Sequence, residues 1–152
     1  MNQKFNWILY LNFTLAIPYV ISLSRYSSYV LYNHKNELLR DSILEMDSSI
    51  ERLDFIIAVD GLRIQGQGHA GETLIHFPKE NAIFDVFNSF ADTIQYSYKF
   101  TILSTVFKAL YGCKKTCLKV NARGLLDIQF MMPITDQSIG FIELVVIPFI
   151  FF

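Results

Sequence analysis

The sequence predicts an α+β fold made of two consecutive βαβββ units. Three observations lead to this prediction. Apolar and polar residues alternate in several short segments, apolar residues recur at helical spacing in two others, and these segments follow the same order in both halves of the chain. The halves share this order of elements but no convincing residue identity. Because an antiparallel sheet buries one face, we expect both helices to lie on one face of the sheet.

The first unit begins near residue 26. Asn36 is a suitable N-cap for a helix in which Leu39, Ile43 and Met46 share one face. Apolar residues then alternate with mostly polar ones from Leu53 to Val59, which predicts a half-buried strand. Asp60-Gly61 predicts a two-residue hairpin turn after it. The expected elements are a strand at Tyr29–His34, a helix at Glu37–Met46, and three strands at Leu53–Val59, Leu62–Gln65 and Thr73–Phe77.

The second unit repeats this order after Pro78. The stretch Pro78–Phe90 has a mixed character, because its apolar residues recur at roughly helical spacing. Gly112 is a natural stop for the helix that precedes it. The expected elements are a strand at Tyr96–Ile102, a helix at Leu103–Tyr111, and strands at Cys117–Val120, Leu125–Met132 and Ile139–Ile147.

Length and composition indicate one folded domain. The chain has 152 residues, of which 52% are hydrophobic, and its formal net charge is -1. This charge argues against a protein that grips nucleic acid over its whole surface. The two cysteines are expected to be free thiols. We expect an apolar leader of uncertain status at residues 1–25 and the folded domain at residues 26–150.

The leader leaves alternatives open. Trp7–Leu23 has no charged residue, but it is shorter than a comfortable membrane span and is interrupted by Asn12 and Pro18. It also resembles a signal peptide, although no clear cleavage pattern follows. A membrane or secretory segment therefore competes with a non-native start placed before a real domain.

Motif searches predict neither catalysis nor a cofactor. Gly66–Gly71 matches the G-x-G-x-x-G pattern, but a nucleotide site needs a helix to follow, and the next segment is β-type. We therefore interpret these glycines as a turn between strands. The three histidines are scattered, and Asp54 and Asp60 are interpreted as solvated surface. No metal site and no cofactor are expected.

Basic residues cluster on or near the predicted helices. Arg40 and Lys35 accompany the first helix, and Lys108, Lys114 and Lys115 accompany the second, with Lys119 and Arg123 close behind. If both helices share a face, these side chains form a surface for a nucleic-acid backbone. An ordinary solvated helix face is the alternative, and it is favoured by the acidic residues Glu37, Asp41 and Glu45.

Several stretches, in order over roughly residues 30 to 147, resemble the Rad-one family of checkpoint-clamp subunits. They are the segments from Leu39-Arg40-Asp41 to Glu45-Met46-Asp47, His76-Phe77-Pro78-Lys79-Glu80, Tyr96-Ser97-Tyr98-Lys99-Phe100, Lys119 to Met131 and Phe141-Ile142-Glu143. The resemblance implies a sliding-clamp (PCNA-like) domain. The family has two such domains in each subunit, so we expect this chain to be the carboxy-terminal half, with residues 1–25 in place of the first domain.

The resemblance also implies a function. A member of this family is a subunit of the heterotrimeric 9-1-1 ring, which a clamp loader places around double-stranded DNA in the nucleus. There it serves checkpoint signalling and repair with Rad-nine-type and Hus-one-type partners. Arg40, Lys108, Lys114 and Lys115 would face DNA. The strand Thr73-Leu74-Ile75-His76-Phe77 would be the edge that pairs with a neighbouring subunit.

Two other functions compete with this one. A 3′-to-5′ exonuclease activity is sometimes attached to the family, but it needs clustered acids that hold metal ions, and we find no such cluster in the sequence. The other is a membrane-anchored product, which depends on the leader being genuine, or a truncated product without function.

Overall fold

The computed structural model describes residues 29–33, 36–80, 84–89, 93–109, 111–136 and 138–149. The expected leader lies outside these residues, as do Lys35, His34, Ile83 and Phe90. The boundary between residues 25 and 26 therefore stays a prediction. Among the described residues, no helix is long and apolar enough to cross a membrane.

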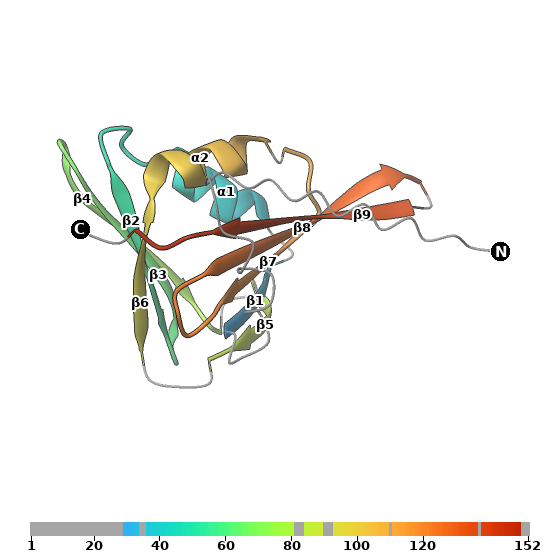
Figure 1. Ribbon diagram of the computed structural model, residues 1–152, viewed down its shortest axis with the longest axis horizontal. Coiled ribbons are helices and arrows are strands. Elements are labelled where there is room, and N and C mark those ends of the chain that lie inside the picture. Colours follow the sequence, from blue (N-terminus) through green and yellow to red (C-terminus); the bar gives the residue numbers. More distant parts are fainter. Residues whose placement is uncertain are drawn as a thin grey trace.

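Two antiparallel sheets and two helices make up the described part of the fold (Figure 1). One sheet has the strand order β5-β1-β7-β8-β9, and the other has the order β4-β3-β2-β6. The elements are β1 (Tyr29–Asn33), α1 (Asn36–Leu44), β2 (Arg52–Ala58), β3 (Gly61–Gly68), β4 (Gly71–Pro78), β5 (Phe84–Asn88), β6 (Ile94–Lys99), α2 (Phe100–Ala109), β7 (Lys115–Val120), β8 (Leu126–Thr135) and β9 (Ser138–Val146).

The core lies where both sheets meet the two helices. The helices lie side by side in Figure 1, and they contribute the buried Ile43, Leu103 and Phe107. The ring of Phe107 meets that of Phe130 on β8 edge-on, with their centroids 5.9 Å apart. Because one apolar cluster contains residues of both helices and both sheets, the helices cover the inner face of each sheet.

The predicted order of elements is confirmed, with one strand added. Each unit contains a strand, a helix and three strands, but β5 precedes the second unit. The helical spacing in Pro78–Phe90 was misleading, because Phe84–Asn88 pairs with β1 as an edge strand. Phe87 of this strand is buried. A spacing of three residues is helical and would put Phe84 and Phe87 on opposite faces of a regular strand. The pairing with β1 is irregular between Phe84 and Val86, and the two rings meet with their centroids 5.3 Å apart.

The second helix also begins earlier than predicted. The strand β6 ends at Lys99, and Phe100 already belongs to α2. The backbone N–H of Phe100 donates to the carbonyl of Glu51, 2.9 Å away, just before β2 begins. The alternation of apolar and polar residues that extends to Ile102 therefore does not come from one strand. Its first part is the buried face of β6, and its last part is the buried face of α2.

Two tyrosines of β6 join one sheet to the other. The hydroxyl of Tyr98 is buried and donates to the carbonyl of Gly124, and that of Tyr96 donates to the carbonyl of Ala122, both at 2.8 Å. These carbonyls belong to the turn between β7 and β8. Burial raises the pKa of the Tyr98 phenol, so the hydroxyl stays a hydrogen-bond donor. Gly124 has a φ of 80°, which favours glycine at this contact.

The glycine-rich stretch lies in the β3–β4 hairpin. It was predicted to be a turn between strands, but Gly66 and Gly68 belong to β3 and Gly71 to β4, so only residues 69–70 form the turn. Gly68 and Gly71 are paired across the two-residue turn. The turn is fixed from outside by the α1–β2 loop, because Ser49 Oγ accepts from the N–H of His69 at 2.7 Å and Asp47 Oδ2 accepts from that of Ala70 at 3.2 Å. The backbone amides of this turn therefore donate hydrogen bonds to the loop between α1 and β2. The glycine-rich backbone does not form the start of a helix.

Candidate interface surfaces

Arg40 is the basic residue of α1, and its charge is already paired. Its Nη2 lies 2.8 Å from Asp41 Oδ1, and its guanidinium carbon lies 5.1 Å from the ring centroid of Tyr111. Only 16% of the side chain is exposed. Tyr111 follows α2, so this cation–π contact joins the two helices at the surface. Sequence reasoning missed Tyr111, and no signal in the sequence pairs it with Arg40.

Lys108 and Lys114 are the exposed basic residues at the end of α2. Lys108 stands in its last turn, and Lys114 stands in the loop before β7. The exposed acids Glu37, Asp41 and Glu45 lie on or next to α1. The exposed surface of the two helices therefore carries charges of both signs in similar number, which predicts weak attraction for a polyanion.

Lys115 does not lie on the surface of the two helices, where it was predicted. It is the first residue of β7, and its Nζ pairs with Asp85 Oδ2 of β5 at 3.4 Å. Side chains alternate along a strand, so Lys115 lies on the opposite face from the buried Leu118 and Val120. That face points away from the helices. Lys119 lies on the same outer face, with its Nζ 3.9 Å from Asp127 Oδ2.

The strand β4 is an edge of its sheet, as the resemblance implied. Its register shows which backbone groups are available. The N–H of Lys79 donates to the carbonyl of Asp60, and the same register pairs Phe77 with Leu62 and Ile75 with Ile64. Hydrogen-bonded pairs alternate with non-bonded pairs in an antiparallel ladder, so the odd-numbered residues of β4 bond to β3.

The even-numbered residues therefore present their backbone groups away from β3. They are Glu72, Leu74 and His76, and all three side chains are exposed on the outer face of the sheet. Of the predicted edge residues, Thr73, Ile75 and Phe77 turn their backbone inward. Pro78 has no N–H, and it closes the available edge. Sequence reasoning missed Glu72, whose place follows only from the register.

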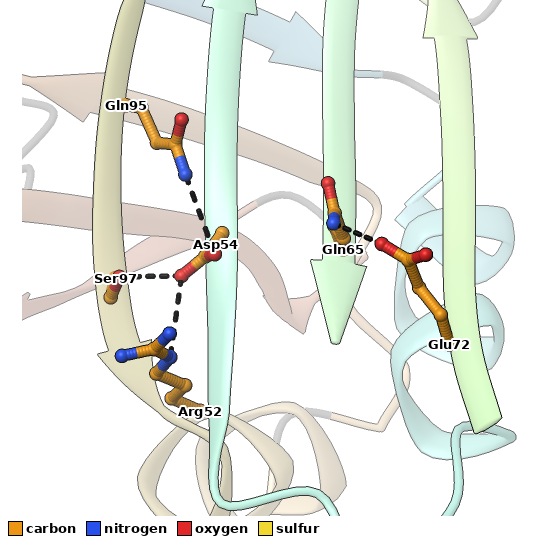
Figure 2. Close-up of polar contacts among 6 residues, drawn as sticks. All are labelled: Arg52, Asp54, Gln65, Glu72, Gln95 and Ser97. Atoms are coloured by element: carbon orange, nitrogen blue, oxygen red, sulfur yellow. Dashed lines mark hydrogen bonds and ion pairs between the residues drawn. The ribbon is translucent and has the colours of Figure 1, made fainter. Parts of the chain in front are cut away.

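Polar side chains on the outer face of this sheet contact one another between neighbouring strands (Figure 2). Asp54 of β2 accepts from Ser97 Oγ and from Gln95 Nε2 of β6, and Arg52 Nε lies 3.9 Å from it. Gln65 of β3 donates to Glu72 of β4. Asp54 therefore serves as a hydrogen-bond acceptor between strands. Among the described residues, no group of three or more His, Cys, Asp or Glu is arranged to hold a metal ion.

The outer face of the other sheet carries a pair of acids that sequence reasoning missed. Gln129 Nε2 lies 3.0 Å from Glu143 Oε1 and 3.4 Å from Asp127 Oδ2. Burial and the nearby Glu143 raise the pKa of Asp127 to about 7, against the pull of Lys119. The other oxygen of Asp127 is buried without a hydrogen-bond partner. The residues come from β8 and β9, so only their pairing brings them together.

Two antiparallel sheets whose inner faces are covered by two adjacent helices identify the fold class of this chain. The fold is that of a sliding clamp. It resembles PCNA from Thermococcus kodakaraensis, with a TM-score of 0.66 over 90% of this chain and 51% of that chain, at 10% sequence identity. At this identity the likeness concerns the fold alone.

Sequence comparison shows the family. Residues 18–132 match the family model described as "Repair protein Rad1/Rec1/Rad17", and the chain belongs to this family. It is 28% identical over 111 residues to the cell cycle checkpoint protein RAD1 of Homo sapiens, covering 72% of this chain and 39% of that protein. It is 25% identical over 118 residues to the DNA damage checkpoint control protein rad1 of Schizosaccharomyces pombe, covering 75% and 36%. The chain thus spans less than half the length of these relatives.

Proposed function

We propose that this chain acts as part of a DNA-damage checkpoint clamp, in the nucleus. In this proposal it joins Rad-nine-type and Hus-one-type subunits in a ring that a clamp loader places around double-stranded DNA. The observation that carries the proposal is the clamp fold of a chain that belongs to the Rad1/Rec1/Rad17 family. The ring serves as a platform for checkpoint and repair proteins.

The proposed role requires little direct affinity for DNA. A closed ring holds DNA by topology, so the inner surface needs only to tolerate the polyanion. The helix surface fits this requirement, because Lys108 and Lys114 are exposed near an acidic α1. Arg40, by contrast, is committed to Asp41 and Tyr111. We propose that Lys108 and Lys114 are the residues that approach the phosphates.

The proposed subunit contact uses the edge of β4. An incoming strand gains main-chain hydrogen bonds from the outward-facing groups of Glu72, Leu74 and His76. The 57% exposed Leu74 offers it an apolar contact at the centre. We expect Leu74→Pro to abolish binding to the neighbouring subunit, because it removes a central N–H. Gln95→Ala on β6, at the opposite edge of the sheet, is the matched control.

A test of topology decides the proposal. The chain is mixed with its two partner subunits and the clamp loader, and complexes are collected on closed circular DNA and on the same DNA after linearisation. We expect retention on the circle, release after a single cut, and no retention with Leu74→Pro. Equal retention on both DNAs, or none on the circle, contradicts the proposal.

We also propose that the chain is a scaffold without nuclease activity. Asp54 is occupied by neutral donors and one arginine, which suits a structural acceptor (Figure 2). A metal-dependent exonuclease assay on pure protein tests this. Turnover that Asp54→Ala abolishes would overturn the proposal.

A further inference from the structure

The free edge of β4 is complementary to itself. Its outward-facing residues read Glu72, Leu74 and His76, with an acid on one side of an exposed leucine and an imidazole on the other. Two such edges that meet in antiparallel orientation about Leu74 place leucine opposite leucine. They also place Glu72 of each copy opposite His76 of the other, so both opposing polar pairs consist of a carboxylate and an imidazole.

The backbone supports the same arrangement. All three residues turn their N–H and C=O groups away from β3, as the bond between Lys79 N–H and the carbonyl of Asp60 establishes. Three hydrogen-bonded pairs follow across the contact, with about six hydrogen bonds between the copies. The side chains of opposed residues lie on the same face, so the outer faces of the two sheets join into one. No buried face becomes exposed.

The edge strand β9 of the other sheet does not match itself in this way. By the same alternation, the bond from Asn121 N–H to the carbonyl of Leu125 makes the even-numbered residues of β9 bond to β8. Glu143 and Val145 therefore present their backbone outward, and Glu143 lies beside Asp127. Two β9 edges that meet about Glu143 would place its carboxylate opposite that of the other copy, which opposes this pairing.

We propose that two copies of this chain associate through their β4 edges, forming an antiparallel dimer with two-fold symmetry centred on Leu74. The dimer uses the edge that the proposed function assigns to a partner subunit, so the two contacts exclude each other. The dimer is then a form of the chain that keeps the edge covered before clamp assembly. Only one strand from each copy contributes to the contact, so the dimer is weak and depends on concentration.

Sedimentation velocity of the full chain, in reducing buffer, measures how far two copies associate at each concentration. We expect the average mass to rise from one chain toward two as the concentration increases a hundredfold. Leu74→Pro removes a central N–H that has no partner among the residues the structure describes, and an edge strand tolerates proline there. We expect it to remain a monomer, with an unchanged thermal unfolding midpoint.

Charge variants test the register. Glu72→Lys puts a cation opposite His76, and His76→Glu puts a carboxylate opposite Glu72, so each variant alone should associate at least tenfold more weakly than the natural chain. Mixed together, the two variants pair acid with base at both contacts, and we expect the mixture to regain the dimer. Lys99→Glu on β6 is the matched control and should associate as the natural chain does.

The outcomes separate this inference from the proposed function. A monomer at all concentrations, a dimer that survives Leu74→Pro, or a mixture that fails to recover overturns the inference. Association through β4 and β9 would appear as assemblies larger than two copies that Glu143→Lys disrupts, and it also overturns the inference. In each case retention on circular DNA with the partner subunits still tests the clamp proposal separately.

Discussion

Substitution of Gly124 by alanine tests the contact between the β7–β8 turn of one sheet and the tyrosines of β6 in the other. A side chain at this position meets two costs. The φ of 80° is the left-handed region, which costs a residue with a Cβ about 1–2 kcal/mol. The added Cβ would also lie within 2.8 Å of Cγ of Tyr96, so the ring must move. Such overpacking costs about 1–3 kcal/mol.

Gly112 is the matched control for this substitution. Its φ is 89°, but a Cβ there meets nothing within 4 Å. Gly112→Ala therefore carries the backbone cost alone. We expect it to destabilise the chain by about 1–2 kcal/mol. We expect Gly124→Ala to cost about 3–5 kcal/mol in total, since displacement of the Tyr96 ring also weakens its bond to the Ala122 carbonyl.

Urea unfolding followed by circular dichroism measures both variants. With a slope of about 2 kcal/mol per molar urea, Gly112→Ala should lower the midpoint by about 0.5–1 M and Gly124→Ala by about 1.5–2.5 M. Equal midpoints for the two variants would refute the reasoning, because the backbone cost would then be the whole effect and the contact with Tyr96 would contribute nothing.

Three further predictions follow from charges and hydrogen bonds. The pKa of Asp127 is raised to about 7, so the folded state holds a proton that the unfolded chain releases near pH 4, and this contribution to stability is lost as pH rises to 7. The thermal unfolding midpoint should therefore fall less between pH 5 and pH 8 in the Asp127→Asn variant than in the natural chain. An equal fall in both proteins would contradict this prediction. Asp47→Ala should raise amide exchange at the β3–β4 turn about tenfold in hydrogen-exchange mass spectrometry, with unchanged protection arguing against its role. Replacing Lys108 and Lys114 together by alanine should lower the salt dependence of DNA binding by about 2 in log–log slope, whereas Lys115→Ala should not alter it.

Much of the fold could be predicted because local patterns are sufficient for it. The alternation from Leu53, followed by Asp60-Gly61, predicts a strand and a tight hairpin without any distant contact, although the turn lies one residue earlier, at Val59-Asp60, because Ala58 pairs with Gly61. The same logic placed a turn within Gly66–Gly71, but it made the turn too long, because β3 continues to Gly68 and β4 begins at Gly71. The strand β5 was missed because it is a short edge strand, and its identity depends on pairing with β1.

The candidate surfaces could be predicted only in part. Arg40, Lys108 and Lys115 were predicted to lie together because each stands on or near a predicted helix and both helices were expected to share one face. Sequence spacing does not tell which side of a sheet is covered, and the packing of the helices leaves Lys115 on the far side. Asp127 and Glu143 stand 16 positions apart, and they meet because β8 and β9 pair.

The sequence by itself determined the two βαβββ units and the resemblance to the Rad-one family, because alternation, helical spacing and turn residues are local properties. The resemblance pointed to β4 as an edge, but tertiary structure alone decided which of its residues turn their backbone outward, and that β5 is a second edge strand. Those features depend on strand order and register, which are fixed by contacts between distant segments. The self-complementary edge of Glu72, Leu74 and His76 is therefore visible only in the folded chain.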